Sequence, residues 1–163
     1  MKITDVNAIN EDVPENPATQ VIIRNALPEE LNAVSRLIRS AYLEYQPLVP
    51  SGAWKDYMRD ITDVRSRLGV SVLIVAKLER RLAGTVTLYL NGSQSGEGWP
   101  DGWAGIRLLA VHPKERGRGI GRLLVEECIR RCRQSGLCLK CHSESRCFGM
   151  KHRKNEESPA PTQ

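Results

Sequence analysis

Apolar residues recur at helical spacing in two segments of the N-terminal half. The first segment starts after Pro28, which a first helical turn tolerates, and predicts an amphipathic helix that runs to Tyr45. The run "QPLVPSG" then predicts a break, and a second helix is expected from Trp54 to Leu68. The apolar positions that carry these predictions are Leu31, Val34, Leu37, Ile38, Ala41, Tyr42 and Tyr45, then Trp54, Tyr57, Met58, Ile61, Val64 and Leu68.

Shorter apolar runs rich in β-branched residues predict strands. The run "VSVLIVAKL" is nearly continuous, as expected for a strand that is covered on both faces, and "ERR" turns it into a hairpin with the next run. A loop rich in Gly, Ser and Trp precedes the fourth strand. The predicted strands are "QVIIRNA" (20–26), "VSVLIVAKL" (70–78), "LAGTVTLYL" (82–90), "AGIRLLAV" (104–111) and "LCLKCH" (137–142).

The segment "VHPKERGRGIGRLLVEECIRRC" (111–132) places three glycines at alternate positions just before a third helix. On a helical wheel its apolar residues share one half and its charged residues the other, and Gly136 stands where the helix should stop. The element order is therefore β-α-α-β-β-β-α-β, an α/β fold. The apolar half holds Ile120, Leu124, Val125, Cys128, Ile129 and Cys132; the other holds Arg122, Glu126, Arg130, Arg133 and Gln134.

A strand that leads through glycines into a helix is suited to bind an anion. The first N–H groups of a helix lack internal partners, glycine lets the backbone close around oxygens, and arginines add matching donors. The Walker A pattern is missing, and Arg122 stands where the dinucleotide pattern G-x-G-x-x-G needs its third glycine. The pattern is instead R-x-x-G-x-G, from Arg116 to Gly121.

The stretch "IRLLAVHPKERGRGIGRLLVEECIRRCRQSG" resembles the acetyl-CoA-binding motif of the GNAT superfamily of N-acetyltransferases. The upstream order of one strand, two helices and a hairpin is similar to the same family. The resemblance implies a mixed, mostly antiparallel sheet with flanking helices over residues 20–142. Residues 1–19 are then a flexible arm and 143–163 a polar, disordered tail, with the family's C-terminal elements missing or atypical.

The resemblance also implies a site and a reaction. Backbone groups near Leu109 and Val111 would pair with the pantetheine arm, and the loop amides would hold the pyrophosphate of acetyl-CoA, the co-substrate. The acetyl group would pass directly to a primary amine on a small molecule or peptide. The implied cofactor-binding residues are Leu109, Ala110, Val111, Arg116, Gly117, Arg118, Gly119, Ile120, Gly121 and Arg122.

Two departures from the family pattern leave the catalytic residues unassigned. Many members carry a glutamate where this chain has Gly105. Glu97 and Asp101 in the preceding loop are the nearest carboxylates that could relay a proton instead. Exposed carboxylates are, however, weak bases for an ammonium at pH 7. No tyrosine follows Tyr89 to protonate the leaving thiolate. A natural truncation or a shifted reading frame near residue 140 would explain the tail, and a homodimer that exchanges elements would supply the missing strands.

Other side chains near the motif have an ordinary structural explanation. Tyr42, Tyr45 and Trp54 could line an acceptor pocket, because the segment between the first two helices does so in the family, but helical spacing favours a core or rim position for the two tyrosines. His112 is more often a loop residue than a base. The motif itself could be a turn without a ligand, and its Gly-Arg alternation also occurs in disordered RNA-binding segments, which lack the flanking strand and helix.

Composition narrows these hypotheses without deciding them. A formal charge of +5 suits an anionic partner. No apolar stretch approaches the roughly 18 residues that cross a bilayer, so a cytoplasmic protein is expected. The five cysteines lie in the last quarter of the chain. The spacing of Cys138, Cys141 and His142 suggests a zinc site, but ordinary reduced thiols are the favoured interpretation. An acetyltransferase is favoured over a non-catalytic acyl-CoA-binding module and over a basic nucleic-acid-binding protein.

Overall fold

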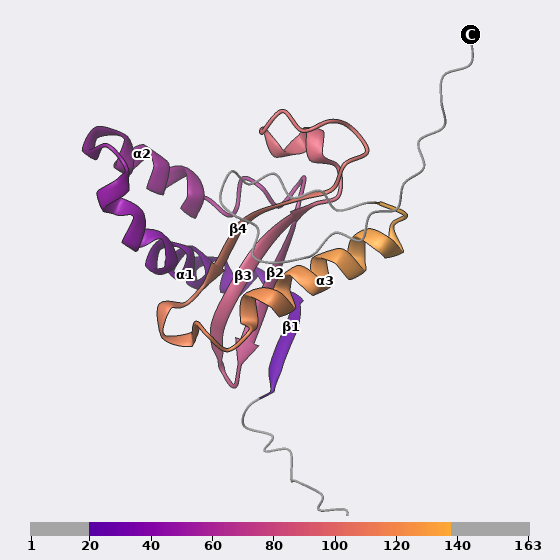
Figure 1. Ribbon diagram of the computed structural model, residues 1–163, viewed down its shortest axis with the longest axis horizontal. Coiled ribbons are helices and arrows are strands. Elements are labelled where there is room, and N and C mark those ends of the chain that lie inside the picture. The colour runs from indigo at the N-terminus through magenta and orange to yellow at the C-terminus, as the bar shows by residue number, and fades with distance from the viewer. Residues whose placement is uncertain (1–19, 138–163) are drawn as a thin grey trace, which may run out of the picture.

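The computed structural model describes residues 20–137, whose strands form one antiparallel sheet in the order β1-β2-β3-β4 (Figure 1). The predicted α/β fold with a mostly antiparallel sheet is therefore confirmed over the described residues. The strand predicted at 137–142 lies outside them except for Leu137, as do the predicted arm and tail. The strands are β1 (Val21–Asn25), β2 (Val72–Leu78), β3 (Arg81–Tyr89) and β4 (Gly105–Val111).

Helices cover both faces of this sheet. Figure 1 shows α1 and α2 on one side and α3 on the other. Short 3₁₀ turns lie before or between these helices and in the loop between β3 and β4. In the described residues no helix has both the length and the apolar composition needed to span a membrane. The helices are η2 (Pro28–Glu30), α1 (Leu31–Tyr42), η3 (Leu43–Leu48), α2 (Ser51–Thr62), η4 (Gly92–Ser95), η5 (Pro113–Glu115) and α3 (Ile120–Gln134).

The pattern of β2 explains this three-layer arrangement. Leu73 and Val75 pack into the core beneath α1 and α2, while Ile74 and Ala76 pack beneath α3. Successive side chains of a strand point to opposite faces, so a strand covered on both sides must be apolar at every position. The nearly continuous apolar run of β2 therefore reflects burial on both faces of the strand, as predicted.

Two helix boundaries differ from the prediction. The first α-helix ends at Tyr42 and continues as η3, and the second ends at Thr62 instead of Leu68. The side chain of Arg67 folds back and donates to the carbonyl oxygens of Asp60 and Asp63, at 2.5 Å each. These bonds satisfy carbonyls that a longer helix would have used internally. Apolar spacing cannot reveal such a cap.

Helix α3 matches its predicted wheel and its predicted end. Ile120, Leu124 and Cys128 are buried against the sheet. Gly136 has a φ of +68°, and Leu137 N–H donates to the carbonyl of Cys132 at 2.8 Å while Gly136 N–H donates to that of Arg133. This is a Schellman motif, in which a left-handed glycine ends the helix.

The surface of α3 contains a carboxylate that makes the fold sensitive to acid. Arg130 and Arg131 each donate to Glu127 at 2.7 Å and hold its pKa down at about 2. An unfolded glutamate titrates near 4.3, so the stabilisation is present above that pH and is lost as the pH falls toward 2. Glu127→Gln should lower the free energy of unfolding at pH 7 by about 1 kcal/mol.

The measurement is urea unfolding of both proteins at pH 7 and pH 3, where the difference should shrink. Glu126→Gln is the matched control, because Glu126 pairs with Arg122, whose side chain is 80% exposed, and such pairs add little. An equal effect of the two substitutions at pH 7 would contradict the assignment.

Candidate functional site

Strand β4 carries a bulge at the point where it approaches the glycine segment. Thr85 lies opposite Ala110 and Thr87 opposite Arg107, so two residues of β4 face only one residue of β3. Leu108, one of those two, has a φ of +54° and a buried side chain, while Leu109 is 38% exposed. A bulge interrupts the ladder and leaves backbone groups unpaired. The backbone expected to pair with a pantetheine arm therefore lies beside an irregular part of the sheet.

The loop after β4 is held open by two left-handed glycines. Gly117 has a φ of +79° and Gly119, the N-cap of α3, a φ of +74°. A Cβ added at either position would meet no atom within 4 Å, so space lies beside this backbone. Among the described residues of α3, Leu123 is the first whose backbone N–H donates to a backbone carbonyl, that of Gly119. The amides before it are available to an anion.

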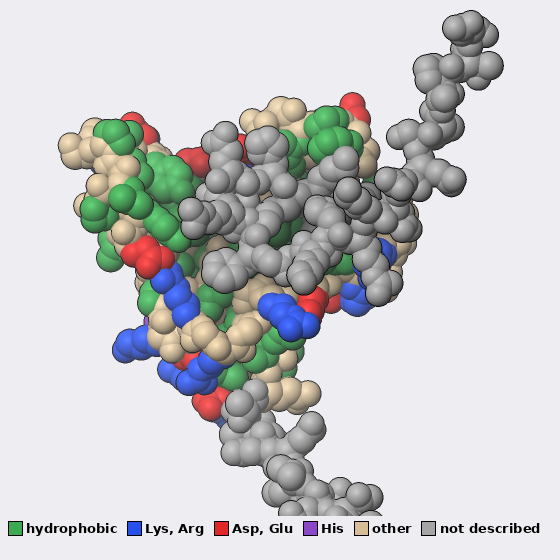
Figure 2. Space-filling view, in the orientation of Figure 1, with side chains coloured by type: hydrophobic (Ala, Val, Ile, Leu, Met, Phe, Trp, Pro, Cys, Tyr) green, Lys and Arg blue, Asp and Glu red, His purple; other side chains and the backbone are tan. Residues whose placement is uncertain are grey.

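The three arginines of this segment have different surroundings. Arg118 is exposed, with its guanidinium 3.5 Å from the buried carboxylate of Glu115. The space-filling view shows Lys and Arg side chains around the loop that leads into α3 (Figure 2). Arg122 is bound to Glu126 at 2.6 Å along the outer face of the helix. Of the three side chains, that of Arg118 is best placed to contribute charge at the loop.

Arg116 connects the glycine loop to the end of α1. Its guanidinium forms a fork with Glu44 of η3, at 2.8 and 2.7 Å, and donates to the carbonyl of Ala41 at 3.0 Å. The hydrogen bond from Arg116 lowers the pKa of Glu44. The side chain is thus committed to the protein, and the backbone of Arg116 is the part that remains for a ligand. Sequence spacing gave no sign of this contact, which joins residues 72 positions apart.

An aromatic cluster lies at the same end of α1. The rings of Tyr42, Tyr45, Tyr57 and Trp54 are neighbours, with centroid distances of 5.8 Å for Tyr42–Tyr45 and 5.9 Å for Trp54–Tyr57. Tyr42 packs against the core, and burial raises its pKa to about 12; Tyr45 is exposed. The prediction of core and rim positions for the two tyrosines is confirmed, and the exposed rings form a surface next to the Arg116 contact.

Gly105 is the position at which the resemblance implied a glutamate, and its surroundings leave no room for a side chain. A Cβ at this position would lie 1.9 Å from the ring of Trp99, which packs directly over the backbone of β4. Trp99 also contacts Tyr89 edge-on, at 6.4 Å between centroids, and Tyr89 is the β3 partner of Gly105. The indole therefore leaves no room for a side chain at position 105. The sequence showed that a glutamate is missing at position 105, but it did not show that the ring of Trp99 packs over this position.

The two substitute carboxylates are not arranged as a free base. Glu97 is bound to Arg107 of β4 at 2.8 Å, and the same guanidinium lies 4.0 Å from Asp60 and donates to the carbonyl of Ser95. Asp101 is exposed in a turn. Arg107 therefore organises this edge of the site, a role that its place in a strand did not suggest.

The described cysteines behave as ordinary thiols. Cys128 and Cys132 are buried on α3, and burial raises the pKa of Cys128 to about 12. Within residues 20–137 no cluster of three or more His, Cys, Asp or Glu side chains could hold a metal ion. The zinc hypothesis concerned Cys138, Cys141 and His142, which lie outside the described residues.

The sequence profile of the acetyltransferase (GNAT) family matches residues 32–145, so the chain belongs to that family. No curated protein has a significantly matching sequence. Among solved structures, the chain is similar to a GNAT acetyltransferase from Brucella melitensis in complex with acetyl-CoA, at 22% identity and a TM-score of 0.55, covering 73% of this chain and 72% of that one.

Two further structures have the same fold. The PaiA N-acetyltransferase from Thermoplasma acidophilum, in complex with coenzyme A, is 17% identical with a TM-score of 0.57, over 72% of this chain and 75% of that one. A GCN5-related N-acetyltransferase from Ralstonia eutropha JMP134 is also 17% identical, with a TM-score of 0.60, over 85% and 98%.

Proposed function

We propose that this protein transfers the acetyl group of acetyl-CoA directly to a primary amine. The observation that carries the proposal is the open loop at Gly117 and Gly119, which presents unpaired amides at the start of α3 beside a bulged strand. Such a geometry suits a pyrophosphate. Family membership and neighbours crystallised with acetyl-CoA or coenzyme A support the same ligand.

The residues present fit this co-substrate. The amides of residues 116–122 and the guanidinium of Arg118 would hold the pyrophosphate, and the backbone from Leu109 to Val111 would orient the pantetheine arm. Bound acetyl-CoA would supply an activated thioester. The contribution of the chain is then position: it holds donor and acceptor together, which lowers the entropic part of the barrier.

Proton transfer in this chain would rely little on a protein base. Trp99 occupies the place above Gly105, and Glu97 is engaged by Arg107. The amine would therefore have to arrive neutral, having lost its proton to solvent. We expect kcat/KM to rise with pH up to the pKa of the acceptor amine, without a plateau set by an enzyme carboxylate near pH 5 to 7.

The deciding experiment has two parts. Calorimetry with acetyl-CoA measures binding, and release of free coenzyme A against a panel of amines, amino acids and peptides measures transfer. Thiol release with at least one amine, rising with pH, is the expected result. No heat at millimolar acetyl-CoA would refute the proposal.

The same experiment tests a second candidate, a non-catalytic module that binds acyl-CoA. The observation in its favour is the indole of Trp99 over Gly105, because it leaves no room there for a carboxylate side chain that could act as a base. This candidate predicts calorimetric binding of acetyl-CoA with no thiol release from any member of the panel.

A further inference from the structure

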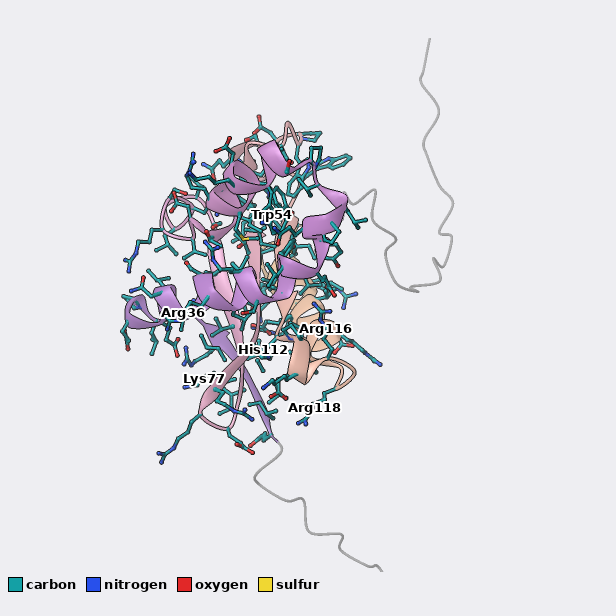
Figure 3. All side chains as sticks on the ribbon, turned by 90° about the vertical axis from the view of Figure 1, so that its left-hand side faces the viewer. Arg36, Trp54, Lys77, His112, Arg116 and Arg118 are labelled. Atoms are coloured by element: carbon teal, nitrogen blue, oxygen red, sulfur yellow. The ribbon has the colours of Figure 1, made fainter. Side chains whose placement is uncertain are left out.

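A second basic site lies between α1 and the β2–β3 hairpin. A pocket of about 430 Å³ is lined there by four basic side chains, Arg36 from α1 and Lys77, Arg80 and Arg81 from the hairpin, together with His112 at the end of β4. Figure 3 shows Arg36 and Lys77 on one side of His112 and the loop residues Arg116 and Arg118 on the other. The pocket is lined by residues of α1, whereas the glycine loop leads into α3, which Figure 1 shows on the opposite face of the sheet. Glu115 lies between the two places, 3.5 Å from both Arg81 and Arg118.

The positive charge of this pocket is only partly neutralised. Among the described residues, Arg36 and Arg80 form no ion pair; Arg81 lies 3.5 Å from Glu115. Lys77 is 3.8 Å from Glu30, but two bonds of 2.6 and 2.7 Å from Arg24 already hold that carboxylate. Positive charge with no internal partner is retained at little cost only where solvent or an anion compensates it.

Polar donors and an apolar wall complete the pocket. The Nδ1 atom of His112 accepts a hydrogen bond from the N–H of Lys114 at 3.3 Å, so Nε2 is the ring nitrogen that can donate to a ligand. The hydroxyl of Ser40 lines the same space, and Leu37 and Leu82 supply the apolar part. Most of the remaining lining is charged, and Arg36, Arg80 and Arg81 are exposed, so the pocket is an open, basic one that a charged ligand can enter.

We propose that this pocket binds a small phosphorylated molecule, separately from the coenzyme. Guanidinium groups match phosphate oxygens in pairs, and here three of them come from two elements around one space. Glu29 and Glu30 line the end nearest the start of α1, where they would repel a second anionic group and accept hydrogen bonds from hydroxyl or amino groups. The ligand is therefore anionic at one end and neutral or cationic at the other.

The test is calorimetry with inorganic pyrophosphate at low salt, on two proteins. The first is the full chain saturated with coenzyme A, which occupies the glycine loop. The second is the Gly119→Val variant, in which the loop cannot bind pyrophosphate even if the chain binds no coenzyme. Arg36→Ala and Arg80→Ala should each weaken pyrophosphate binding about tenfold, the loss of one charge-assisted contact. Arg39→Ala is the control, an exposed arginine of the same helix that does not line the pocket.

The proposal requires pyrophosphate binding in both proteins, with losses at Arg36 and Arg80 and none at Arg39. It is overturned if coenzyme A abolishes the heat, if Arg36→Ala weakens coenzyme A binding instead, or if all three substitutions act alike. The Gly119→Val measurement needs no coenzyme. Pyrophosphate binding to this variant can therefore be interpreted even if the proposed acetyltransferase function fails.

Discussion

Replacing Gly119 with valine is expected to weaken acetyl-CoA binding about a hundredfold while the chain stays folded. Gly119 has a φ of +74°, where a β-branched residue costs on the order of 1–3 kcal/mol. The loop can relieve that strain only by rotating its backbone, which turns away amides worth about 1.5–3 kcal/mol each to a charged phosphate. The added side chain would meet no atom within 4 Å at its Cβ, so the core is undisturbed.

The measurement is calorimetry with acetyl-CoA, alongside thermal unfolding. Gly136→Val is the matched control, because Gly136 has a φ of +68°, also has open surroundings and ends the same helix. Both variants should lose a similar amount of stability, but only Gly119→Val should lose affinity. Equal affinities in the two variants would show that the loop does not hold the coenzyme.

Gly105→Ala is expected to lower the free energy of unfolding by about 2–3 kcal/mol. The new Cβ would lie 1.9 Å from the ring of Trp99, so the indole must leave its place on β4. Overpacking of this kind costs on the order of 1–3 kcal/mol. Gly52→Ala is the control: Gly52 lies in α2 with no atom within 4 Å of an added Cβ, and alanine should be neutral or slightly stabilising there.

Urea unfolding of a double-mutant cycle isolates the cause of this loss. In a Trp99→Ala background the clash is absent, so Gly105→Ala should cost less than about 0.5 kcal/mol. A full loss in both backgrounds would mean that the glycine is required for its backbone and not for the indole. The same packing predicts that Gly105→Glu, which restores the family's carboxylate in sequence, disrupts the loop and does not raise activity.

The elements with a strong local pattern were predicted well. The four described strands, the hairpin and α3 with its final Gly136 follow from period, turn residues and capping, all of which act over a few neighbouring positions. The segment from Arg116 to Gly121 was predicted to need glycine for its backbone, and two of its three glycines, Gly117 and Gly119, adopt the positive φ that glycine allows.

The parts that escaped prediction depend on polar side-chain contacts or on backbone distortion. The Arg67 side chain caps the end of α2, and the bulge in β4 places Leu108 at a positive φ. Nothing in the composition of either segment marks these features, because their cost is offset by contacts made elsewhere.

The sequence by itself determined the fold class and the place of the glycine loop, because helices, strands and glycine turns arise from interactions within a few residues. Only the tertiary structure decided what surrounds that loop. It directed Arg116 to Glu44, set Trp99 over Gly105 and brought Arg36 to the β2–β3 hairpin. Each of these contacts joins segments that the chain brings together by packing apolar faces, so local pattern contains no record of which polar groups meet.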